Sequence, residues 1–106
     1  MLFSRRKRAA SPDPDSIALL RRISGKHVTS VTAFGPDGVE QVLGRDGAVN
    51  VAYDDVTIIC NGSEVFRCRL ETVTAGELIS LNGARISGLD REGNRLSVLV
   101  HYSRYA

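Results

Sequence analysis

The chain contains two cysteines and two histidines, which are residue types that bind zinc or serve as nucleophile and base. They are Cys60, Cys68, His27 and His101. Structural zinc sites usually take their ligands in close pairs, whereas at least seven residues separate each of these from the next. We therefore expect no zinc site, no other cofactor, and two thiols that pack as small buried apolar groups.

The spacing of the cysteines also predicts that they do not form a disulfide. Asn61-Gly62 is a strong hairpin turn signal, so Cys60 faces a residue between Ser63 and Val65. Cys68 then lies roughly 10 Å or more further along that strand. A disulfide needs Cα atoms within about 7 Å, so both thiols stay free. Free thiols are typical of a reducing compartment, and we expect a cytoplasmic protein.

Catalytic groups are scarce in this sequence. Asp54 and Asp55 are adjacent, so on a strand they point to opposite faces, and we interpret them as the start of a loop. His101 is out of phase with the apolar residues of the last strand, so it faces solvent or a partner. An enzyme that uses Cys60 or Cys68 as nucleophile would need a lowered thiol pKa and a nearby base. We expect no enzymatic activity.

Arginines of the predicted strands are the main candidates for binding. Arg67 and Arg69 lie on one face of a strand and could extend toward Arg85 on a neighbouring strand, forming a patch for an anion or an acidic partner. The alternative that we favour is ordinary pairing with nearby carboxylates. The acidic residues close to them in sequence are Glu64, Glu71 and Glu77.

Four of the 14 basic residues form a run near the N-terminus: Arg5, Arg6, Lys7 and Arg8. Without that run, 10 basic residues face 12 acidic ones, so the remainder carries −2 although the whole chain carries +2. The run could bind nucleic acid or an anionic membrane surface. We favour a solvated, disordered tail over residues 1–12. No long apolar stretch follows the run, so we expect no export signal. No part of the chain approaches the ~18 consecutive apolar residues of a transmembrane segment, so we expect none.

The remaining residues predict a single β-rich domain over 13–106 that begins with a helix over 13–24. Asp13 is a good N-cap, Pro14 suits the first helical position, and Gly25 ends the helix. Turn signals, among them those at residues 35–38 and 45–47, then recur every 8–12 residues, as expected of an all-β protein. The predicted strands are Val28–Phe34, Val39–Leu43, 49–53, Val56–Cys60, Glu64–Leu70, Leu78–Leu81, Ala84–Leu89 and 96–102. We predict an antiparallel meander of seven or eight short strands, curled into a small sandwich or barrel.

Two stretches resemble the YabP/YqfC sporulation family. They run from Gly47 to Gly62 (GAVNVAYDDVTIICNG) and from Glu77 to Leu89 (ELISLNGARISGL). The shared features are a glycine turn, a short strand, an acidic break, an apolar strand and a further glycine turn. The resemblance covers residues 47–89, and the segment after Cys68 and the hairpin beyond Leu89 depart from it. It implies a non-enzymatic bacterial protein associated with sporulation, with no active site to carry over.

These observations together predict a non-enzymatic cytosolic β-rich module for binding or assembly, which acts through a protein partner or by self-assembly. The alternative is a small β-barrel that binds nucleic acid with the Arg5–Arg8 tail and the strand arginines.

Overall fold

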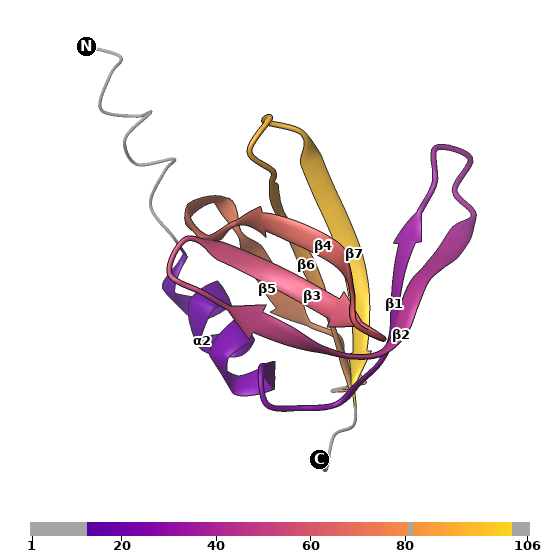
Figure 1. Cartoon of the computed structure of the whole chain (residues 1–106), viewed down its shortest axis with the longest axis horizontal. Helices are drawn as coiled ribbons and strands as arrows, with labels where there is room; N and C mark the ends of the chain where they lie inside the picture. The colour runs from indigo at the N-terminus through magenta and orange to yellow at the C-terminus, as the bar shows by residue number, and fades with distance from the viewer. Residues whose placement is uncertain (1–12, 81, 103–106) are drawn as a thin grey trace.

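The computed structural model describes residues 13–80 and 82–102 of the chain. Over these residues one α-helix precedes a set of β-strands, which confirms the predicted mainly-β fold with a short N-terminal helix (Figure 1). The elements are α2 (Pro14–Ile23), β1 (Val28–Phe34), β2 (Glu40–Val51), β3 (Asp55–Cys60), β4 (Ser63–Arg69), the 3-10 helix η1 (Leu70–Thr72), β5 (Thr74–Glu77), β6 (Gly83–Leu89) and β7 (Arg95–Tyr102). The predicted basic tail over 1–12 lies outside the described residues.

Helix α2 begins as its sequence predicts. Asp13 is the N-cap, and its carboxylate accepts a hydrogen bond from the Ser16 amide at 3.2 Å. The helix buries Leu19, Leu20 and Ile23 and contacts mainly β5. A ten-residue helix is only marginally stable alone, so this packing is what holds it. Neither helix in the described part of the chain is long and apolar enough to cross a membrane.

The seven strands form one antiparallel sheet in the order β4-β3-β2-β1-β7-β6-β5. Consecutive strands pair as in the predicted curled meander except for β4 and β5, and the first strand pairs with the last. The two edges are therefore β4 and β5, which are consecutive in sequence through η1. The sheet curls so strongly that β4 packs on β6: a Cβ added at Gly88 would lie 2.7 Å from Cys68 Sγ. One curled sheet is closer to the barrel than to the sandwich.

The structure corrects the prediction of two strands at Val39–Leu43 and 49–53. A single strand, β2, covers this region, and the expected turn at residues 45–47 is a bend within it. Asp46 has a left-handed φ of 57°, and the next residue is Gly47. A Cβ at Gly47 would lie 2.0 Å from the Ile59 carbonyl oxygen. Turn residues here bend a strand instead of ending it.

The predicted strand at Leu78–Leu81 is also misplaced. The strand at this point is β5, Thr74–Glu77, whose residues are small or polar, and Leu78–Ser80 form the turn that follows. The Leu78 amide closes this turn by donating to the Gly83 carbonyl at 2.9 Å. Residue 81 lies outside the described residues. β5 is a strand because it pairs with β6 and packs under α2, and an apolar pattern in its own sequence plays little part.

Candidate functional site

The β1–β2 hairpin projects beyond the rest of the sheet (Figure 1). Its turn over residues 35–38 is closed by the Gly35 amide, which donates to the Val39 carbonyl at 3.0 Å. In the described part of the chain, four of the seven exposed large apolar side chains lie on this hairpin. They are Phe34 (55% exposed), Val39 (56%), Val42 (49%) and Leu43 (40%). We call these four residues the hairpin patch.

Pairing within the hairpin places patch residues close together. Phe34 pairs with Glu40 and Thr32 pairs with Val42, so Phe34 and Val42 are diagonal neighbours on one face. The register shifts beside Leu43, which makes it the extra residue of a β-bulge. Thr32 lies at the base of this face, only 5% exposed, and its buried hydroxyl has no hydrogen-bond partner among the residues that the structure describes.

One edge of the projecting part of β2 has no strand beside it in the described structure. On its β3 side, ladder pairing begins only at Gly47, which pairs with Cys60. One residue earlier in β2, the Asp46 carbonyl accepts a hydrogen bond from the Asn61 amide at 3.2 Å. The β3–β4 hairpin reaches as far as Gly44, where an added Cβ would lie 2.7 Å from Cys60 Cβ. Residues Glu40–Leu43, all exposed, therefore present an open row of backbone groups; we call this segment the free β2 edge.

The predicted arginine patch is divided by the fold. Arg67 and Arg69 lie together on β4, whereas Arg85 lies on β6, a strand that does not pair with β4. Arg67 contacts Glu64 at 2.7 Å and Asp55 at 2.6 Å, and Arg69 contacts Glu71. The hydrogen bonds to Glu64 and Asp55 raise the pKa of the Arg67 guanidinium. The positive charges of β4 thus have carboxylate partners, as in the alternative that we favoured.

Asp55 is a residue whose role the sequence reasoning missed. It is the first residue of β3 and not part of a loop, and only 8% of it is exposed. Its carboxylate accepts from Arg67 at 2.6 Å and from Arg91, in the turn before β7, at 3.2 Å. It therefore links β3 and β4 to the β6–β7 turn. An Asp at the start of an apolar strand with arginines elsewhere was the only sequence signal for this link.

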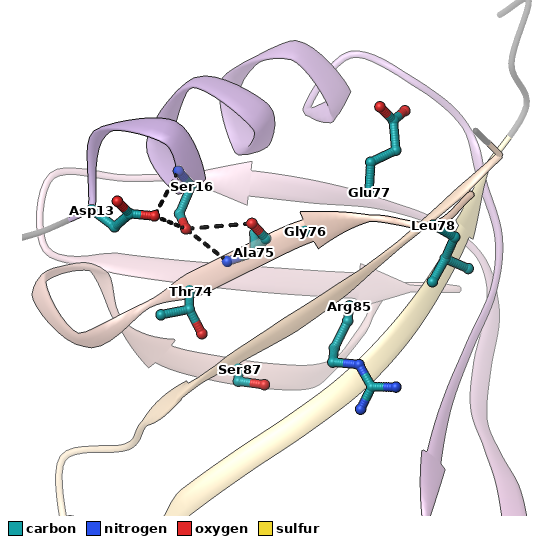
Figure 2. Close-up of a pocket in the computed structure, with 9 residues that line it drawn as sticks. All are labelled: Asp13, Ser16, Thr74, Ala75, Gly76, Glu77, Leu78, Arg85 and Ser87. Atoms are coloured by element: carbon teal, nitrogen blue, oxygen red, sulfur yellow. Dashed lines mark hydrogen bonds between the residues drawn. The ribbon is translucent and has the colours of Figure 1, made fainter. Parts of the chain in front are cut away.

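A pocket of about 410 Å³ lies between the start of α2 and strands β5 and β6 (Figure 2). Several of its polar side chains already have hydrogen-bond partners. The Ser16 hydroxyl donates to Asp13 at 2.6 Å and accepts from the Ala75 amide at 2.8 Å, and the Ser87 hydroxyl lies 2.9 Å from that of Ser97. Arg85 extends away from Asp13 in this view. The Ser16 contacts mainly attach the helix to the outer edge of β5.

The cysteines and histidines do not converge. Both thiols are free and buried, as predicted. Burial, with a smaller contribution from Asp55, raises the pKa of Cys68 to about 12, and burial with Asp46 raises the pKa of Cys60. His27 contacts Asp46 at 3.2 Å on the surface, and His101 is half-buried on β7. Within residues 13–80 and 82–102, no three His, Cys, Asp or Glu side chains cluster as metal ligands would.

Comparisons of the chain with protein-family models, with curated proteins and with solved structures give no match. Any assignment of function therefore depends on the residues of this chain.

Proposed function

We propose that the protein is a non-enzymatic cytosolic module for binding or assembly, and that the hairpin patch is its contact surface. The observation that carries the proposal is the gathering of Phe34, Val39, Val42 and Leu43 on a projecting hairpin. Phe34 and Val42 are neighbours on one face of the hairpin, and exposed apolar patches are typical of protein interfaces. The two unpaired thiols support a reducing compartment.

A catalytic role for the thiols has little support. The nucleophile is the thiolate, and burial that raises the pKa of Cys68 to about 12 holds that group in the neutral form near pH 7. Cys60 is 3% exposed, which also limits access by a substrate.

The resemblance over residues 47–89 supports a narrower proposal, that this module is associated with sporulation. It is a separate proposal, because the hairpin patch lies wholly outside that stretch. The order of neighbouring genes tests it directly. Neighbours that encode spore-coat or cortex proteins would support the narrower proposal, and consistent neighbours of unrelated function would refute it.

Binding of nucleic acid remains the alternative prediction. Its strand arginines Arg67 and Arg69 have carboxylate partners, which leaves Arg85 and the Arg5–Arg8 run to contact phosphates. Phosphate-driven binding weakens steeply as salt rises. Absence of binding to single- or double-stranded nucleic acid at low salt would eliminate this alternative.

Site-specific photo-crosslinking in cells tests the main proposal. A photoreactive amino acid is placed at Val42 in the patch, or at Ser97 on the exposed part of β7 as a matched control. We expect a crosslinked protein adduct from position 42 and little from position 97. Equal adducts from both positions, or none from position 42, would contradict the proposal.

A further inference from the structure

Three edge segments of the sheet, the outer edges of β5 and β4 and the free β2 edge, differ in how they are protected against pairing. The outer edge of β5 is occupied by the helix, because the Ser16 hydroxyl binds the Ala75 amide. The edge strand β4 carries Glu64, Arg67 and Arg69 and has a bulge at Val65. Charged residues and bulges are the usual protection of edge strands. The free β2 edge has neither a helix nor a neighbouring strand in the described structure.

Apolar side chains lie at the centre of the free β2 edge. Gln41, Val42 and Leu43 are all exposed, and no charge interrupts them. Only the ends of the segment are charged, with Glu40 on one side and Arg45, just beyond Gly44, on the other. An exposed edge with an apolar centre is a template for the addition of another strand.

The distribution of charge on this edge is complementary to itself. Glu40 pairs with Phe34 and Arg45 pairs with Ser30, two even-numbered positions of β1 that share a face. When two such edges run antiparallel about a two-fold axis, the Glu40 end of each copy lies beside the Arg45 end of the other. In the described structure neither side chain makes an ion pair within its own chain, so both charges are available.

We infer that the free β2 edge pairs with the same edge of a second copy of this chain, joining the two sheets into a homodimer. The inference rests on the proposed function, since it names the partner of the hairpin patch. A two-fold interface uses the same patch on both subunits, so Val42 and Leu43 of one copy meet their counterparts in the other. Backbone hydrogen bonds along the edge add to the apolar contact.

Charge reversal provides the sharpest test, because Glu40 and Arg45 are both exposed and make no ion pair among the described residues. The oligomeric state of the full chain is measured by size-exclusion chromatography with light scattering at low and high micromolar concentrations. Glu40→Arg and Arg45→Glu each place like charges across the proposed interface, and we expect each to weaken the dimer by about tenfold or more. The double variant restores opposite charges and should restore the dimer. Glu71→Gln, in η1 just after the edge strand β4, is the control away from the free β2 edge.

The expected result is a dimer for the original chain, the control and the double variant, with weaker association of both single variants at equal thermal stability. A monomer at every concentration would overturn the inference. A dimer that both single reversals leave intact, or that the double variant fails to restore, would also overturn it by placing the interface elsewhere. The proposed function is tested separately. If the protein is a monomer but position 42 still crosslinks to another protein, the binding module is supported and self-association is refuted.

Discussion

Strand β3 and the projecting half of β2 contain similar apolar residues and use them in opposite ways. In β3, Val56, Ile58 and Cys60 point into the curl of the sheet and are almost fully buried. In β2, Val42 and Leu43 are large apolar residues that face solvent. The difference lies in what surrounds each strand: β3 has β2 and β4 on its two sides, whereas among the described residues this part of β2 pairs only with β1. Apolar character therefore stabilises the fold in one region and is available for binding in the other.

Gly47 marks the boundary between the two regions, and its substitution should have the largest effect. In Gly47→Ala the new Cβ would lie 2.0 Å from the Ile59 carbonyl oxygen and 2.9 Å from the Cys60 Cα, both backbone atoms. We expect a loss of about 3 kcal/mol or more in the free energy of unfolding, measured by urea titration. Gly76→Ala is the control, because nothing lies within 4 Å of its added Cβ. Similar losses in both variants would contradict a tight crossing at Gly47.

Core truncation compares the two regions directly. Ile58→Ala removes a fully buried side chain, and we expect it to lower the free energy of unfolding by about 3 kcal/mol. Leu43→Ala in the hairpin patch should change it by no more than about 0.5 kcal/mol in dilute monomer. Chemical denaturation of both variants at the same low protein concentration provides the measurement. A large loss for Leu43→Ala would show that the patch stabilises the monomer, which would contradict its role as a free surface.

Removal of the Asp55 carboxylate should lower the free energy of unfolding by an intermediate amount. Asp55→Ala leaves Arg67 and Arg91 without their buried carboxylate, and we expect a loss of about 1–3 kcal/mol. Glu71→Ala breaks the exposed pair with Arg69 and should cost about 0.5 kcal/mol or less. Thermal unfolding of the two variants gives the comparison. Equal small losses would mean that Asp55 adds no more than a surface ion pair.

The smallest expected effect is a gain in stability at the base of the hairpin. Thr32→Val replaces a buried hydroxyl that has no hydrogen-bond partner with a methyl group of similar size. We expect the free energy of unfolding to rise by about 1 kcal/mol, since the desolvated hydroxyl is removed. A decrease on calorimetry would indicate that the hydroxyl is hydrogen-bonded in solution.

Local signals predicted much of this fold. Features that depend on residues close in sequence or on chain reach could be predicted. They are the N-cap at Asp13, the hairpin turns at residues 35–38 and at Asn61-Gly62, and the unpaired thiols. The misplaced strand at Leu78–Leu81 shows the limit of local patterns. Strand β5 exists because β6 and α2 flank it, and those are contacts between segments distant in sequence.

The candidate surface was less predictable than the fold. Val42 and Leu43 belong to a predicted strand, but nothing in their sequence indicates that the strand lacks a neighbour on one side. Carboxylate partners for the β4 arginines were the favoured prediction, but the partner Asp55, twelve residues from Arg67, was not among the acidic residues named for it. Exposure depends on the sheet order, and the pairing of the first strand with the last was not visible in local patterns.

Hydrogen exchange of the full chain over a range of protein concentrations tests most directly whether the free β2 edge is where copies of this chain meet. Exchange is followed for amides of Glu40–Leu43 and for those of Asp55–Cys60 in β3. The account predicts that the outward amides of the β2 segment exchange quickly in dilute solution and slow down as concentration rises, while β3 stays protected throughout. Exchange at Glu40–Leu43 that is the same at every concentration, or slowing confined to β4, would contradict it.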